Sequence, residues 1–118
     1  MNRLFKLFGA LLLLTNLPTY AHEVRPAYLE LRETQTIEFN VRWKTPMRGD
    51  MRLALSPVFS AQTKELTPVA TRHTGSAEVQ TWRMKAVEPL RGSTLRIDGL
   101  QTTMTDTLVR AKFADGTS

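Results

Sequence analysis

Two histidines, His22 and His73, carry the metal-binding chemistry that this sequence offers. His22 follows Ala21, so cleavage of the chain after Ala21 would expose a free α-amine next to the imidazole of the same residue. An amine with a reference pKa of about 8 and an imidazole with one of about 6.5 can both give up a proton to a metal at neutral pH. With the imidazole of His73 they would supply three nitrogen ligands, a set that favours copper(II) or, less strongly, nickel(II).

The surroundings of His73 favour a simpler interpretation. It lies between Arg72 and Thr74 in a polar stretch, and the sequence contains no third histidine. The methionines of the expected mature chain are too far apart in sequence to suggest a soft-metal site: Met47, Met51, Met84 and Met104. We therefore predict no bound cofactor, and we keep copper or nickel at His22 and His73 as the alternative.

Groups for catalysis are scarce. The chain has no cysteine, no Gly-x-Ser-x-Gly motif and no glycine-rich loop for a phosphate group. Carboxylates occur close together as Glu30 with Glu33, and again as Asp98 with Asp106, but nothing in the sequence places either pair in a shared cleft. We expect no catalytic residue, no enzymatic activity and no small-molecule substrate.

Residues 1–21 have the order of a secretory signal peptide. Arg3 and Lys6 form a positive head, an apolar run covers residues 7–14, and Ala21 ends a stretch of fairly small residues. The apolar run is shorter than the roughly 20 residues that a membrane-spanning helix needs. We expect cleavage after Ala21 and a mature chain of residues 22–118 outside the cytoplasm. Without cleavage the segment would act as a tether, and the folded part would face the same side.

Size and composition narrow the class of protein. The 97 residues that remain after removal of the leader suit one small domain. An exported domain without cysteine must be stabilised by packing alone, which is more typical of the bacterial periplasm than of disulfide-rich eukaryotic secretion. Loss of Arg3 and Lys6 with the leader leaves 14 basic and 11 acidic residues, a net charge of +3.

The basic residues do not suggest nucleic-acid binding. They are spread among carboxylates without a basic run or a row of aromatic residues on which bases could stack. The solvent-facing sides of strands explain them more simply, and we predict no nucleic-acid partner. The first of them in the mature chain are Arg25, Arg32, Arg42, Lys44, Arg48 and Arg52.

Alternation of apolar and polar residues predicts strands. Residues 27–33 and 37–44 alternate, and they would form a hairpin whose second strand buries Ile37, Phe39, Val41 and Trp43. Pro46 and Gly49 are expected to end that strand.

The rest of the chain predicts shorter elements. Further strands are predicted over residues 51–55, 78–85, 94–97 and 107–113, with Asp98-Gly99 as a turn. Residues 56–76 are expected to be a long connection with one short strand at 67–71. No segment predicts an amphipathic helix.

The expected fold is all-β: an immunoglobulin-like antiparallel β-sandwich of about seven short strands, with a small barrel as the competitor. Trp43 and Trp82 would then be core residues and not a binding platform. The expected organisation is a signal peptide over 1–21 and a periplasmic β-sandwich domain over 22–118.

Several segments occur in a recognisable order. The most specific opens the mature chain, Ala21-His22-Glu23-Val24-Arg25-Pro26-Ala27-Tyr28-Leu29-Glu30-Leu31, and others follow at residues 41–44, 48–53, 90–92, 97–100, 105–110 and 114–116. In this order they resemble the N-terminal extracytoplasmic domain of bacterial HupE/UreJ-type membrane proteins. The resemblance covers essentially the whole mature chain. It implies a signal peptide before the domain and a polytopic membrane domain after it, so residue 118 would be a truncation point.

The resemblance has functional implications. It implies a non-catalytic periplasmic domain that binds a partner or organises the membrane domain of the same protein, tethered to the inner membrane and linked to nickel or other metal supply. The metal-handling residues would lie in membrane helices outside this sequence. Many relatives carry a cysteine pair that this chain lacks. Two alternatives stay open: a free-standing periplasmic copper or nickel chaperone that uses His22, and a structural protein-interaction domain whose strand edges contact a partner.

Overall fold

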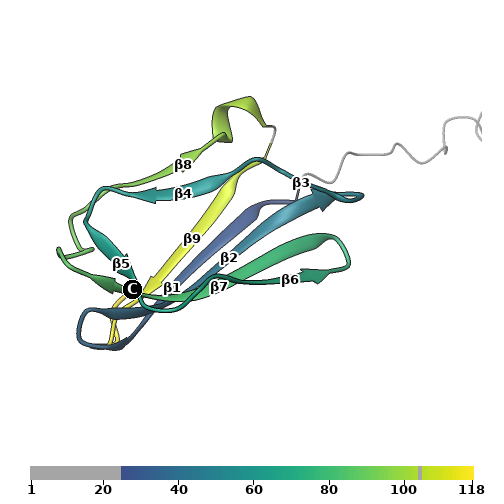
Figure 1. The fold of residues 1–118 in the computed structure, drawn as a ribbon. Coiled ribbons are helices and arrows are strands. Elements are labelled where there is room, and N and C mark those ends of the chain that lie inside the picture. Colours follow the sequence, from purple (N-terminus) through teal and green to yellow (C-terminus); the bar gives the residue numbers. More distant parts are fainter. Residues whose placement is uncertain (1–24, 104) are drawn as a thin grey trace, which may run out of the picture.

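The computed structural model describes residues 25–103 and 105–118, and within them the chain is almost entirely β-structure (Figure 1). The described elements are β1 (Ala27–Gln35), β2 (Glu38–Arg48), β3 (Met51–Arg52), β4 (Ser56–Phe59), β5 (Thr63–Glu65), β6 (Ala70–Thr74), β7 (Ala77–Ala86), β8 (Leu95–Asp98), the 3-10 helix η1 (Leu100–Thr102) and β9 (Thr107–Lys112). The prediction of an all-β fold is confirmed. The proposed cleavage site and His22 lie outside the described residues.

The strands form one large mixed sheet and one small sheet. The large sheet has the order β5-β7-β2-β1-β9, with β6 also paired to β7 and β3 to β2, while β4 and β8 pair with each other. All neighbours are antiparallel except β1 and β9, which run parallel. The amide of Ala27 donates to the carbonyl of Asp106 at 2.8 Å, so β9 starts at the end of the sheet where β1 starts. The sequence had predicted an antiparallel arrangement throughout; the immunoglobulin-like topology stays a prediction.

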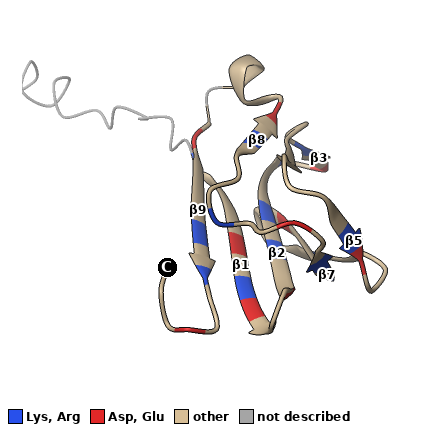
Figure 2. Cartoon of the chain, turned by 90° about the vertical axis from the view of Figure 1, so that its left-hand side faces the viewer, with Lys and Arg blue, Asp and Glu red and all other residues tan. Residues whose placement is uncertain are grey.

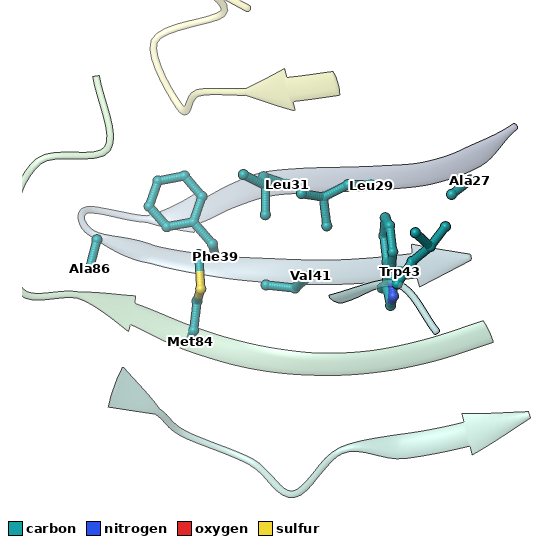
Figure 3. Close-up of a cluster of buried hydrophobic side chains, with 9 residues drawn as sticks. Ala27, Leu29, Leu31, Phe39, Val41, Trp43, Met84 and Ala86 are labelled. Carbon is teal, nitrogen blue, oxygen red and sulfur yellow. The ribbon is translucent and has the colours of Figure 1, made fainter. Parts of the chain in front are cut away.

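One face of the large sheet forms the core. Alternate residues of β1, β2 and β7 are buried there (Figure 3). They pack with Leu55 and with side chains of the small sheet. Full burial of one large aliphatic or aromatic side chain contributes about 1.5–3 kcal/mol, so this face supplies most of the stabilisation. The buried cluster consists of Ala27, Leu29, Leu31, Phe39, Val41, Trp43, Leu55, Met84 and Ala86, with Phe59, Leu95 and Ile97 of the small sheet packed against it.

The predicted hairpin forms, but Ile37 does not share the buried face of β2. It lies in the turn with a positive φ of 64°, and 41% of it is exposed. The turn residues are Thr36 and Ile37, because β1 continues to Gln35. A tight hairpin turn requires positive φ, which overrides the burial that the side chain alone would favour. The other three predicted core residues of β2 are buried.

Pro46 does not end β2, contrary to the prediction. The strand continues to Arg48, with Pro46 opposite Ala77 of β7. The carbonyl of Pro46 accepts a hydrogen bond from the amide of Leu53 at 3.2 Å, so its backbone edge faces away from β7. The missing N–H of proline therefore costs no hydrogen bond to β7.

The segment from residue 51 to residue 76 differs most from the prediction. The expected strand at 51–55 shortens to β3, and Leu55 is fully buried in the connection to β4. The expected long connection contains three strands, β4, β5 and β6, in place of one at 67–71. These strands are three to five residues long, and every residue of β6 is exposed. Apolar and polar residues alternate little in these strands. The strands are defined by pairing with β7 and β8 more than by burial of one side.

Gly99 links the small sheet to η1 and needs to be glycine for two reasons. Its φ is 87°, in the left-handed region. A Cβ on Gly99 would also overlap the carbonyl oxygen of Ala54. Gly92 shares the first constraint, with a φ of 77°, but a Cβ added to Gly92 would have no heavy atom within 4 Å. Substitutions at these two glycines can therefore distinguish the cost of a positive φ from the cost of steric overlap.

We predict that Gly99→Ala destabilises the fold more than Gly92→Ala does. Both substitutions place a side chain at positive φ, which costs about 1–2 kcal/mol. Gly99→Ala adds an overlap with backbone, and such overpacking costs about 1–3 kcal/mol more. Urea denaturation would give the free energy of unfolding of each variant. Equal losses at the two positions would contradict the steric argument.

Candidate interaction surface

The solvent-facing side of the large sheet carries a set of cations that we call the basic face. Because strands alternate, the residues of β2 between those of the core point to this side, and pairing aligns them with residues of the neighbouring strands. Figure 2 shows basic residues on the adjacent strands β9, β1 and β2. The basic face consists of Arg32, Arg42, Lys44, Lys64, Arg72, Arg83, Lys85, Arg110 and Lys112, as the strand registers place them.

The positive charge of this face is poorly balanced. Two carboxylates share it, Glu30 and Glu38, as the strand registers place them. Arg83 Nη2 lies 3.1 Å from Glu38 Oε2, and this is the only ion pair that the basic face makes within the described residues. Glu30 accepts a hydrogen bond from the hydroxyl of Tyr28 at 3.4 Å. The registers place Glu30 opposite Arg42 and Arg110, but no ion pair joins them within the described residues. Cations thus outnumber carboxylates on this face.

Two pairs of cations face each other directly across neighbouring strands. Arg32 of β1 lies opposite Lys112 of β9, and Lys64 of β5 lies opposite Lys85 of β7. Like charges in directly opposed positions destabilise a sheet. These two pairs therefore contribute no stabilisation to the fold.

Two open hollows lie on the basic face, and Arg42 borders both. The first has a volume of about 420 Å³ and is also lined by Arg25, Tyr28 and Lys44. The second, of about 520 Å³, is also lined by Glu30, Arg32, Thr67 and Arg83. Both are open depressions bordered by cationic side chains, and uncharged residues such as Pro68, Ala70 and Trp82 also line the second.

Of the two predicted metal ligands, the structure describes only His73. His73 lies in β6, is exposed, and places its Nε2 3.3 Å from Glu78 Oε1. Glu78 also pairs with Arg52 at 3.0 Å. Within residues 25–103 and 105–118, no group of three histidine or carboxylate side chains could hold a metal ion. Because His22 lies outside these residues, the copper or nickel hypothesis stays a prediction.

The carboxylates considered for acid–base chemistry have other partners. Glu30 and Glu33 point to opposite faces of β1, as the register of the strand requires. Glu33 accepts hydrogen bonds from the amides of Ala114 at 2.9 Å and Ile37 at 3.2 Å, so it ties two turns together. Asp98 accepts one from Arg96 at 2.6 Å.

Strand β9 forms one edge of the large sheet and exposes apolar surface. Leu108 is 55% and Val109 is 49% exposed, although they point to opposite faces. In the described residues β9 pairs with β1 alone. Since the carbonyl of Asp106 points toward β1, alternation directs the backbone polar groups of Thr107, Val109 and Ala111 away from the sheet. We call this row the free edge of β9.

A cluster beyond β9 fixes the C-terminal turn. The Arg91 guanidinium lies 4.1 Å from the centre of the Phe113 ring, and its Nη2 lies 2.7 Å from Asp115 Oδ2. Asp115 Oδ1 accepts hydrogen bonds from the Thr117 hydroxyl at 2.6 Å and the Thr117 amide at 2.9 Å. The hydrogen bond from the Thr117 hydroxyl, then that from its amide, and the charge of Arg91 lower the pKa of Asp115 below its usual 3.8.

We predict that Thr117→Val raises the pKa of Asp115 toward its usual value, because it removes the largest cause of the shift. The folded pKa is below the unfolded one, so the ionised carboxylate stabilises the turn above about pH 4, and this contribution is lost as the pH falls through the folded pKa. NMR titration of the Asp115 carboxyl carbon would measure the midpoint. Thr71→Val, on exposed β6, is the control and should leave it unchanged; an equal midpoint in wild type and Thr117→Val would contradict the assignment.

Comparison of the chain with models of protein families, with curated proteins and with solved structures gives no match. Within the described residues, no helix is long and apolar enough to cross a membrane. Sequence reasoning missed the basic face because its cations are separated along the chain. The alternation of strands 27–33 and 37–44 was the signal that could have revealed it, since the even-numbered positions of both point to one side.

Proposed function

We propose that this chain is a non-catalytic, extracytoplasmic binding domain that organises a membrane-bound assembly. The proposal includes a HupE/UreJ-type inner-membrane protein as the assembly, a signal peptide over residues 1–21, and a link to nickel or other metal supply. The domain contributes a surface and not a reaction. Its partner is the membrane domain of the same full-length protein or another inner-membrane protein.

The free edge of β9 is the observation that supports this proposal. An edge strand offers a row of unpaired backbone donors and acceptors, and an incoming strand can add to the sheet there. Soluble domains usually protect such an edge with charges, bulges or covering segments. Here Leu108 and Val109 are about half exposed on its two sides. The edge thus combines backbone hydrogen-bonding groups with apolar side chains, as strand addition requires.

The proposal requires export. We expect the mature protein to begin at His22 and to be digested by protease added to spheroplasts but not to intact cells. N-terminal sequencing and immunoblotting of the natural gene product would check both points. A product that retains Met1 and is protected in spheroplasts would contradict the proposal.

Substitution at the free edge tests the binding role. The outward amide of Val109 makes no bond to β1, so Val109→Pro should fold while it removes a donor from the edge. Val109→Thr keeps that donor and is the matched control. Since the chain has no cysteine, Leu108→Cys gives a unique attachment point for a photo-crosslinker in either background.

We expect crosslinking to an inner-membrane protein in the Leu108→Cys background, retention with Val109→Thr and at least about ten-fold loss with Val109→Pro. A ten-fold loss corresponds to about 1.4 kcal/mol, in the range of one hydrogen bond. Circular dichroism would verify that all variants fold. Equal crosslinking in the proline and threonine variants would show that the edge does not bind the partner.

A further inference from the structure

We infer that the basic face is a docking surface for an anionic phospholipid bilayer, with lipid phosphate groups as the counter-ions of its cations. The inference does not depend on the outward backbone groups of the free edge of β9, although Leu108 borders both the edge and the face. It rests on the charge, the register and the shape of the face.

The charge of the face is complementary to a bilayer that contains anionic lipids. Nine cations and two carboxylates share it, as the strand registers place them. Each lysine or arginine close to such a membrane contributes about 1 kcal/mol to binding, and the attraction falls off within a Debye length. An array of this size is sufficient for electrostatic attachment without a lipid-specific pocket.

The opposed cations identify where phosphate groups would contribute most. Arg32 and Lys112 face each other on β1 and β9, and no carboxylate forms an ion pair with either of them within the described residues. A phosphate between two such side chains converts a repulsive pair into two attractive contacts. Lys64 and Lys85 also face each other, at the far edge of the sheet, but there Glu38 of β2 lies opposite Lys85 on its other side.

The layout of the cations favours a bilayer over other polyanions. They are distributed across neighbouring strands, which lie about 4.8 Å apart, and along strands at steps of about 6.8 Å. Lipids diffuse laterally, so one headgroup can move to each cation of such an array. A folded acidic protein would need carboxylates fixed in the same pattern. Single-stranded nucleic acid would need a row of stacking aromatics. The registers place Tyr28 on this face, while Trp82, which lines the second hollow, lies opposite Val41 and packs against the core.

An exposed apolar residue lies within the same surface. Leu108 is 55% exposed and lies opposite Tyr28, between the sheet face and the free edge. A leucine beside an amphipathic tyrosine can enter the headgroup region while the cations remain at the phosphate level. Contact with the bilayer thus buries apolar surface that the fold leaves in water.

Vesicle flotation of the full chain tests the inference. The probes are vesicles of phosphatidylglycerol with phosphatidylcholine, and vesicles of phosphatidylcholine alone. The face variant is Arg32→Gln with Lys112→Gln. The matched control is Arg91→Gln with Arg96→Gln, which removes the same charge from residues that pair with Asp115 and Asp98 away from the basic face. Residues 1–21 are identical in all three proteins, so their contribution cancels.

We expect the face variant to bind anionic vesicles roughly 30-fold more weakly than wild type, the change that corresponds to about 2 kcal/mol for two cations. The control should stay within about three-fold, and none of the proteins should gain affinity for neutral vesicles. The midpoint of urea unfolding should rise for the face variant, because a repulsive pair is removed. Weaker binding with higher stability separates a binding role from a structural one.

Three results would overturn the inference. One is equal loss in the face variant and the control, which would mean that net charge alone matters. Another is saturation of the face by inorganic phosphate at millimolar concentration with loss of vesicle binding, which would assign it to a free anion. The third is binding to duplex DNA or polyglutamate, but not to anionic vesicles, at the same salt concentration.

Discussion

The strict alternation of β2 is the constraint on which the rest of the structure depends. Phe39, Val41 and Trp43 point into the core, with 2%, 2% and 1% of their surfaces exposed. Arg42 and Lys44 point to the opposite side. A slip of one residue would exchange the two sets, burying cations and exposing large apolar side chains, at a cost greater than the stability of a small domain. β1 and β7 are held in register on either side of this strand, β3 pairs with its end, and the remaining strands pair with β1 or β7 or cover the core.

The same constraint determines the charge of the solvent-facing side of the sheet. The core requires apolar residues at every second position, so polar residues accumulate on the other face, and here most of the charged ones are cations. Cations that face each other across neighbouring strands destabilise the fold. The buried core provides enough stabilisation to offset this repulsion. The free edge of β9 has a different origin. β9 pairs with β1 as the last strand of the large sheet, and no described strand pairs with its outer side. The buried core, the basic face and the free edge of β9 are therefore three different surfaces of one sheet.

Sequence reasoning succeeded where one side of a strand is buried. The elements at 27–33, 37–44, 78–85, 94–97 and 107–113 are all found close to their predicted positions, and Trp43 is a core residue as expected. It failed between residues 51 and 76, where the strands are short and largely exposed, so no period of two marks them. It also failed at Ile37, which lies in the turn with a positive φ and is not in the core. It failed at Pro46 because the backbone edge of this residue faces away from β7, so the strand continues past it.

The sequence by itself determined the all-β class, the presence of the main hairpin and the identity of most core residues, because these depend on the local alternation of apolar and polar residues. Only the tertiary structure decided that β9 lies parallel to β1 and that cations distant in sequence share one face. Those features depend on which strands pair with each other, and the residue pattern within one strand does not specify its pairing partners. Charges that are separated along the chain gather only when pairing brings several strands side by side, each with the same side turned to solvent.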